Sequence, residues 1–428
     1  MNTEPLYRKT TLPNGTRIVT SRMDHVRSAT LLLSYRVGSR DERAAQSGIS
    51  HFIEHMLFKG TARRPHSRHI AEEIEGIGGS IDAGTGRETT TYSARVPQHA
   101  VRTGFDVLAD MMQNSLFRPE DMEREREVIT EEIRGINDVP DEVVSELIDA
   151  LAWPNAAVGR PIAGTEETVA SFSRDALLRY LKTRYTPERL VISAAGAIDH
   201  DEIVALATET FGKTPGGRDV ETAMLVPKAQ TRPRVAVVGK EIEQANLALA
   251  VRSVSYLDSR KYAQYLLHII LGGTMSSRLF LRIREELGLA YSVGTYAQTL
   301  PDVGWLTVYA GVEADRAEEA TAAILAELAR LRVERVTEAE FDRARRYVTG
   351  SLLMGLEGSG AVASWIGARE LLLGGVSAPE EIVAEYERVT LDDVQALAEE
   401  VFRPERYNLA VVGPYEDDAP FRRLLTRG

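Results

Sequence analysis

The chain has 428 residues, of which 43% are hydrophobic and 27% charged, a length and composition typical of a folded protein with more than one domain. It contains no cysteine, which excludes disulfides, thiolate metal sites, iron–sulfur clusters and a cysteine nucleophile. The formal net charge of -12 and the absence of a basic stripe disfavour nucleic-acid binding, and no apolar run is long enough to cross a membrane.

The N-terminal part of the chain alternates strand-like and turn-like stretches. Residues 16–21 and 26–37 predict strands, and the turn at residues 13–15, Pro-Asn-Gly, predicts a hairpin with antiparallel pairing. A helical pattern follows at residues 100–113. Since no basic stretch precedes an apolar core at the start, we expect a cytoplasmic location.

Residues 50–59, SHFIEHMLFK, predict an amphipathic helix that carries chemistry. At about 100° per residue, its apolar side chains gather on one side, and His51, Glu54 and His55 gather on the other. Two imidazoles at positions i and i+4 can both reach one metal ion, and the glutamate between them can reach a water molecule in the site. The pattern predicts a zinc site with Glu54 as the catalytic base, although a solvated polar helix face is an alternative interpretation.

Residues 119–138 predict a second, acidic helix. Glu125 and Glu132 fall within its apolar stripe, whereas Glu131 points elsewhere. Burying a carboxylate is costly unless a cation or hydrogen-bond donors compensate. Because a zinc site of this type needs a third protein ligand, the helical phase nominates Glu132, with Glu125 as a supporting or alternative carboxylate. An arginine could also satisfy a buried glutamate.

The chain resembles itself at a shift of 217 residues. That shift pairs residues 184–199 with 401–416, and it lays the strand-like segment from Ser28 on the one from Ala245. We therefore predict an α+β fold of two duplicated domains, each a mainly antiparallel sheet packed with helices. A stretch rich in Pro and Gly marks the joint, which gives a catalytic metal-binding domain, a linker and a degenerate repeat at residues 1–214, 215–234 and 235–428.

The second copy lacks the predicted metal set. Under the same shift one histidine falls on a histidine, but the other three polar residues are replaced: His51 pairs with His268, Glu54 with Leu271, His55 with Gly272 and Glu132 with Thr349. One half is therefore predicted to perform the chemistry, with one Zn²⁺ per chain.

Longer segments resemble the pitrilysin, or M16, metallopeptidases, in particular bacterial two-domain members related to mitochondrial processing peptidase. Besides the acidic helix, they are GISHFIEHMLFKGT at 48–61, GRPIAGTEETV at 159–169 and TMSSRLFLRIREELGLAYSV at 274–293. The resemblance implies that His51, His55 and Glu132 bind zinc and that Glu125 supports the site.

The resemblance also implies substrate contacts. Arg284 and Tyr291 match a pair that holds substrate across a cavity, although from the residues alone they could equally serve packing. Family members bind peptides as an added strand on an exposed sheet edge, matched here by residues 80–96. The implied contacts on this edge are Ala83, Gly84 and Thr85.

These observations predict a zinc-dependent endopeptidase that hydrolyses extended peptides or unfolded segments inside a closed chamber. In the family, two chains form that chamber, so we expect a homodimer with sites completed in trans, and no nucleic-acid or membrane partner. Two alternatives stay open, a peptidase subunit that needs a different partner chain and a non-catalytic interaction subunit. The ligand chemistry also permits manganese or cobalt.

Overall fold

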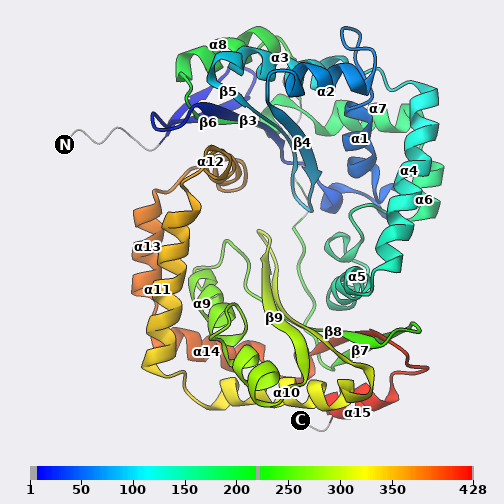
Figure 1. The fold of residues 1–428 in the computed structure, drawn as a ribbon, viewed down its shortest axis with the longest axis vertical. Helices are drawn as coiled ribbons and strands as arrows, with labels where there is room; N and C mark the ends of the chain where they lie inside the picture. Colours follow the sequence, from blue (N-terminus) through cyan, green and yellow to red (C-terminus); the bar gives the residue numbers. More distant parts are fainter. Residues whose placement is uncertain (1–6, 218–221, 223, 427–428) are drawn as a thin grey trace. The chain divides into compact units, whose positions relative to one another are not determined.

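The computed structural model describes residues 7–217, 222 and 224–426. They form two compact units, each built on one β-sheet (Figure 1). The first unit contains residues 7–133, 161–217, 222 and 353–378; the second contains residues 134–160, 224–352 and 379–426. Among the described residues, we find no helix with the length and apolar character needed to cross a bilayer.

The sheet of the first unit has six strands in the order β1-β2-β6-β3-β5-β4, so β4 is an edge strand. Neighbouring strands are antiparallel except for β2 and β6. The predicted hairpin is confirmed, because the turn at residues 13–15 joins the antiparallel strands β1 and β2. The strands are β1 (Arg8–Thr11), β2 (Arg17–Arg22), β3 (Ser28–Tyr35), β4 (Ser80–Thr85), β5 (Thr90–Pro97) and β6 (Leu190–Gly196).

Helices cover both faces of this sheet. Strand β3 is buried along nearly its whole length, because Leu31 lies beside α3 and Leu32 packs with residues of α12. The predicted helix at residues 119–138 is confirmed as α4. The helices of the first unit are α1 (Ile49–Leu57), α2 (Ser67–Glu75), α3 (Val101–Asn114), most of α4 (Pro119–Asp138), α6 (Glu166–Ser171), α7 (Arg174–Arg184), α8 (His200–Phe211) and α12 (Ser359–Leu373).

The second unit repeats this plan with five strands in the order β7-β11-β8-β10-β9, in which only β7 and β11 are parallel. Its strands are β7 (Arg234–Gly239), β8 (Gln244–Ser253), β9 (Ala290–Thr299), β10 (Gly304–Glu313) and β11 (Asn408–Gly413). Its helices are α5 (Pro140–Ala152), α9 (Lys261–Leu271), a π-helical segment (Phe280–Glu286), α10 (Ala317–Val333), most of α11 (Glu338–Gly355), α13 (Pro379–Arg388), α14 (Leu391–Val401) and α15 (Ala419–Thr426).

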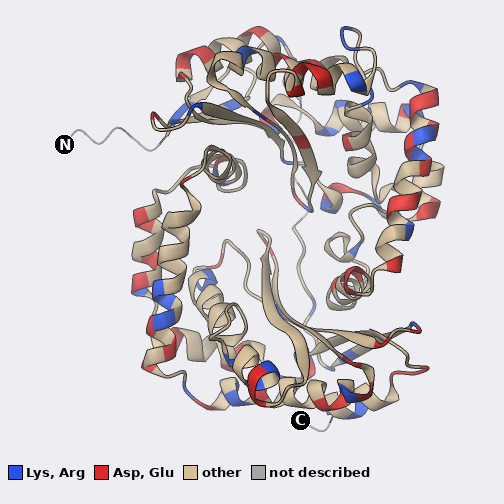
Figure 2. Ribbon diagram, in the orientation of Figure 1, with Lys and Arg blue, Asp and Glu red and all other residues tan. Residues whose placement is uncertain are grey.

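The predicted duplication and fold class are confirmed. Adding 217 to the bounds of β2 gives those of β7, and adding 217 to the bounds of α7 gives those of α14. The strand orders of the two sheets coincide under the same shift, apart from the extra strand β1. Acidic and basic residues are interspersed along helices such as α4 and α11 (Figure 2).

Each unit takes one helix from the other half of the chain. Helix α5 packs on β8 and β11, where Ile148 and Trp153 share a core with Trp305. Helix α12 packs on β2, β3 and β6, where Ile366 shares a core with Leu32. The compact units therefore differ from a simple division of the chain at the predicted linker, because each sheet buries one face under a helix from the other half. The boundary predicted at residues 215–234 separates the two repeats along the sequence, not the two compact units. It stays a prediction.

Candidate metal centre

Helix α1 is held firmly by its start and by its apolar side. Gly48 precedes it with φ of 92°, and the buried Glu42 carboxylate accepts hydrogen bonds from the backbone N–H groups of Gly48 and Ser50 at 2.8 and 2.9 Å. This carboxylate satisfies donors that a helix start leaves unpaired. The apolar residues of α1 are fully buried, as the periodicity predicts: Ile49, Phe52, Ile53, Met56 and Leu57.

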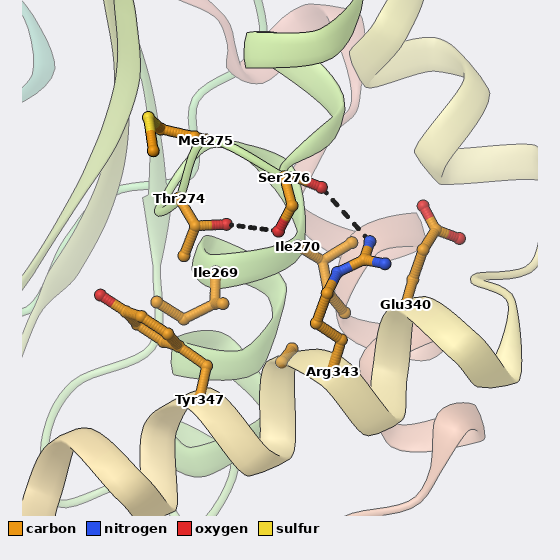
Figure 3. Close-up of a pocket in the computed structure, with 9 residues that line it drawn as sticks. Ile269, Ile270, Thr274, Met275, Ser276, Glu340, Arg343 and Tyr347 are labelled. Atoms are coloured by element: carbon orange, nitrogen blue, oxygen red, sulfur yellow. Dashed lines mark hydrogen bonds between the residues drawn. The ribbon is translucent and has the colours of Figure 1, made fainter.

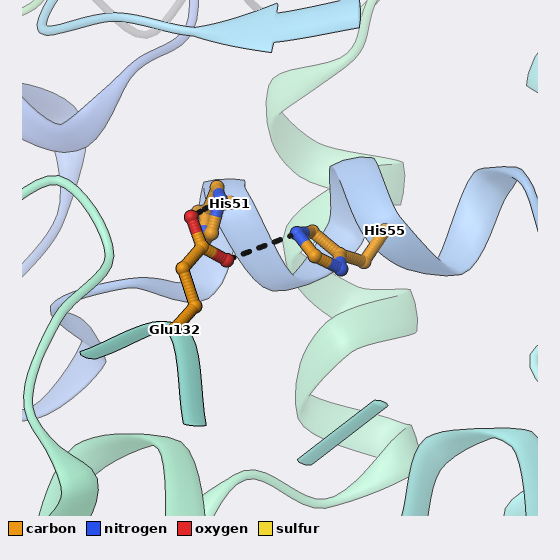
Figure 4. A group of neighbouring side chains, drawn as sticks. All are labelled: His51, His55 and Glu132. Atoms are coloured by element: carbon orange, nitrogen blue, oxygen red, sulfur yellow. Dashed lines mark ion pairs between the residues drawn. The ribbon is translucent and has the colours of Figure 1, made fainter. Parts of the chain in front are cut away.

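The polar side of α1 meets α4 through three side chains (Figure 4). Glu132 Oε1 lies 3.6 Å from His51 Nε2, and Glu132 Oε2 lies 3.6 Å from His55 Nε2. One ligand atom from each residue can be chosen so that all three lie within 4.8 Å of one another. Ligand atoms about 2.0–2.1 Å from a tetrahedral zinc ion lie about 3.4 Å apart. The three side chains therefore fit zinc after a small inward adjustment.

His51 has the protonation state that metal binding requires, and His55 turns its Nε2 atom toward Glu132. Burial, and secondarily the neighbouring His55, lower the pKa of His51 to about 4, so its ring is neutral near pH 7. The Nδ1 atom of His51 is buried and makes no hydrogen bond with the described residues. The Nδ1 atom of His55 lies 3.1 Å from Glu125 Oε2. A proton on Nδ1, donated to this carboxylate, leaves the Nε2 lone pair of His55 free for a metal.

Glu125 is the buried carboxylate of α4, with 5% of its surface exposed. Burial alone would raise its pKa, but hydrogen bonds from His55 and Lys59 outweigh burial and lower the pKa. The cation that satisfies it is Lys59, whose Nζ lies 2.6 Å from Glu125 Oε1. Sequence reasoning considered an arginine and missed Lys59. Its position, four residues after His55, was the available signal, because residues four apart share a helix face.

The burial of Glu132 differs from the prediction, which placed its side chain in the apolar stripe of α4. Its side chain is 43% exposed, so the prediction of a buried stripe was wrong at this residue, although Glu132 lies beside the two histidines. Val128, from the same predicted stripe, is 48% exposed. The end of α4 therefore borders solvent, as a site that admits a substrate requires.

Glu54 lies between the two histidines in sequence and contacts the sheet edge. Thr85, the last residue of β4, donates a hydrogen bond from Oγ1 to Glu54 Oε2 at 2.5 Å. Burial raises the pKa of Glu54, and the hydrogen bond from Thr85 opposes that effect. Ala83 and Gly84 precede Thr85 on the same edge strand, and a Cβ built at Gly84 would meet no atom within 4 Å.

The two predicted substrate contacts of the second half lie together in the second unit. The guanidinium of Arg284, in the π-helical segment, lies 5.3 Å from the centre of the Tyr291 ring at the start of β9. Tyr291 is 79% exposed. The metal-binding candidates belong to the first unit, so the chain carries the two predicted groups on separate units.

Family models and curated relatives match most of this chain. A family model described as insulinase (peptidase family M16) matches residues 17–166, and one described as the peptidase M16 inactive domain matches residues 171–348. An uncharacterized zinc protease of Streptomyces coelicolor is 38% identical over 96% of this chain and 90% of its own length. The uncharacterized zinc protease YmxG of Bacillus subtilis is 38% identical over 96% of this chain and 98% of its own length.

Solved structures share the fold. A protease from Helicobacter pylori has a TM-score of 0.88 at 21% identity, covering 96% of this chain and all of that one. An M16-like peptidase from Alicyclobacillus acidocaldarius has a TM-score of 0.83 at 23% identity, covering 96% of this chain and 99% of that one. Together with the family models, these matches confirm the resemblance that the sequence motifs indicate.

Proposed function

The chain belongs to peptidase family M16, and on this premise we propose that it is a zinc-dependent endopeptidase that cleaves extended peptides or unfolded segments. The observation that carries the proposal is the meeting of His51, His55 and Glu132, with Glu54 beside them. These three residues would hold one zinc ion per chain.

Zinc in this site would polarise the scissile carbonyl and make a water molecule more acidic. Glu54 accepts a proton from the water as the water oxygen bonds to the carbonyl carbon. It then delivers that proton to the nitrogen of the scissile peptide bond as the C–N bond breaks. Burial raises the pKa of Glu54, which favours both roles near neutral pH. The hydrogen bond from Thr85 fixes the carboxylate during these transfers.

The edge strand β4 suits an extended peptide. Its outer backbone groups can pair with a substrate strand near Ala83, Gly84 and Thr85, and such pairing does not depend on substrate side chains. The lack of a side chain at Gly84 leaves room for the substrate backbone. The proposed substrate class is therefore defined by extended conformation rather than by one residue type.

The proposal is tested with a quenched peptide, the purified chain and a Glu54→Gln variant. We expect activity to fall by about 10²–10⁴-fold in Glu54→Gln because the base is lost. Zinc content should be unchanged, and a chelator should abolish wild-type activity. Glu127→Gln, which removes an exposed acid of α4, is the matched control and should keep full activity. Activity that survives Glu54→Gln would overturn the proposed mechanism.

We further propose a homodimer enclosing a chamber, in which Arg284 and Tyr291 of one copy contact substrate bound by the other. Chains with His51→Ala and chains with Arg284→Ala should each be inactive alone. Equal mixing should restore about a quarter of wild-type activity, because half of the dimers are mixed and each of those has one intact site. Mixed dimers that stay inactive would favour a different partner chain.

A further inference from the structure

We propose that Lys59 is a positioning residue of the metal centre, which fixes Glu125 so that Glu125 in turn fixes His55. The inference rests on the proposed zinc site. No sequence motif assigned a role to Lys59. Its ion pair makes Glu125 a carboxylate that supports the site rather than an alternative metal ligand.

The contacts form an unbroken line from Lys59 to the metal-facing nitrogen. Lys59 Nζ contacts Glu125 Oε1 at 2.6 Å, and His55 Nδ1 contacts Glu125 Oε2 at 3.1 Å. Each carboxylate oxygen therefore has its own partner. The Glu125 side chain is only 6% exposed, so little water is available to replace either partner. Rotation of the carboxylate away from His55 would break a charged hydrogen bond in a poorly hydrated place, which is costly.

The place of Lys59 in the chain explains how it reaches Glu125. Helix α1 ends at Leu57, and the N–H of Lys59 still donates to the carbonyl of Met56 at 3.1 Å, so Lys59 continues the turn. Its side chain therefore lies one turn beyond His55, near the C-terminal end of α1, where a cation is favoured. The side chain of Lys59 is 29% exposed, and its ammonium pairs with the buried Glu125.

The charge of Lys59 also explains why Glu125 supports His55 and does not bind the metal itself. Glu54, Glu125 and Glu132 all lie close to the two histidines, and a free carboxylate at Glu125 could turn toward a metal as a further ligand. The ion pair with Lys59 holds it beside Nδ1 of His55. A histidine binds metal more tightly when a carboxylate accepts a hydrogen bond from the ring nitrogen that faces away from the metal.

The second half of the chain supplies an internal control for this assignment. Under the 217-residue shift, Lys59 corresponds to Ser276 and Glu125 to Asp342. Ser276 Oγ instead forms a hydrogen bond with Thr274 Oγ1 at 3.2 Å, and Asp342 pairs with Arg345 at 2.9 Å. The copy without the metal set therefore also lacks the Lys–Glu pair.

The test is the zinc affinity of the full chain, measured by competition with a chromophoric chelator and without substrate. Lys59→Met keeps the length of the side chain and should weaken zinc binding by about 10-fold, the lower end of effects for groups behind a metal ligand. Lys59→Arg keeps the charge and should restore most of the affinity. Lys182→Met, which removes an exposed lysine of α7, is the matched control and should bind zinc like the wild type.

A double variant separates positioning through Glu125 from a general effect of charge. Glu125→Gln has one acceptor oxygen and cannot serve both Lys59 and His55, so adding Lys59→Met to it should weaken zinc binding no further. An equal loss in both backgrounds, or no loss in Lys59→Met alone, would overturn the inference. Thermal melts of the metal-free variants identify any that fail to fold, for which Lys59→Gln is the substitute. Because affinity is measured without peptide, tight zinc binding with no peptidase activity would refute only the proposed function.

Discussion

Helices α1 and α4 of the first unit and helices α9 and α11 of the second occupy corresponding places in two copies of one fold. Among the residues that the structure describes, only the first pair brings a possible metal set together. Between α9 and α11 the second unit instead has a cavity of about 320 Å³, lined by apolar residues such as Ile269 and Met275 (Figure 3). The two units therefore share an architecture but differ in the chemistry of this helix pair.

The residues at which α1 and α9 end explain part of this difference. Helix α9 ends at Leu271, so Gly272, which corresponds to His55, lies beyond the helix. A Cβ built at Gly272 would lie 2.6 Å from Cγ2 of Thr295, so a histidine there would clash unless the backbone moved. Leu271, which corresponds to Glu54, is fully buried. A histidine at position 272 would therefore be strained, and a glutamate at position 271 would be buried.

The largest expected contrast is between His51 and His268, the one pair of histidines that the repeat retains. We expect His51→Ala to weaken zinc binding by more than about 100-fold, because losing a ligand costs more than disturbing the groups behind it. His268→Ala should leave zinc affinity unchanged, since His268 Nδ1 pairs with Thr295 Oγ1 at 2.7 Å within the second unit. Chelator competition measures both. A comparable loss in His268→Ala would break the distinction between the two copies.

Sequence alone predicted the parts of this contrast that depend on periodicity. The helix at residues 119–138, the buried side of α1 and the alignment of the two sheets all follow from local pattern and the internal repeat. Helical phase chose Glu132 over Glu131 for the same reason. The helical features are set by residues close in the chain, and the second sheet repeats the pattern of the first, so spacing and self-comparison carry enough information to predict them.

Sequence did not predict features that depend on which elements meet. Periodicity shows that α5 has an apolar side, but not that this side covers the second sheet rather than the first. It could not pair Lys59 with Glu125, which are 66 positions apart, or show that Glu132 is 43% exposed. These contacts are decided by packing, and one sequence does not reveal them.

A smaller effect is expected at Thr85, which donates a hydrogen bond to Glu54. The second unit has no equivalent hydrogen bond, because Leu271 stands at the position of Glu54. Thr85→Val keeps the shape of the side chain and removes the hydrogen bond to Glu54. We expect kcat to fall by about 10-fold, the low end for losing a hydrogen bond to a charged group. KM and zinc affinity should change little, and Thr85→Ser should restore kcat.

Peptide kinetics with Thr91→Val as control would test the role of Thr85. The Thr91 hydroxyl donates to Ser34 Oγ rather than to Glu54, so its loss should leave kcat unchanged. Equal effects of the two valine variants would mean that disturbance of the β4–β5 hairpin, and not loss of the hydrogen bond to Glu54, lowers kcat.

The last expected effect is on stability rather than on catalysis, and it concerns the ion pair that joins the segment after α9 to α11. Arg278, beyond the end of α9, donates to both carboxylate oxygens of Glu340 on α11, at 2.7 and 3.1 Å. Burial alone would raise the pKa of Glu340, but hydrogen bonds from Arg278 and Thr337 outweigh it and lower the pKa to about 2. A depressed folded-state pKa stabilises the fold above the unfolded value near 4.5, and this stabilisation is lost as pH falls toward 2.

We therefore expect Arg278→Gln to lower the stability of the second unit by about 1–3 kcal/mol at pH 7, the range for a hydrogen-bonded charged pair. The difference in melting temperature from the wild type should shrink between pH 4.5 and pH 2, because acid removes the charge of Glu340 in both proteins. Arg282→Gln is the matched control, since its pair with Glu286 is exposed and should contribute little. Zinc should raise the melting temperature of Arg278→Gln as much as that of the wild type, because the ion pair belongs to the unit without the metal set. A zinc-dependent shift that disappears in Arg278→Gln would instead mean that the two copies are coupled.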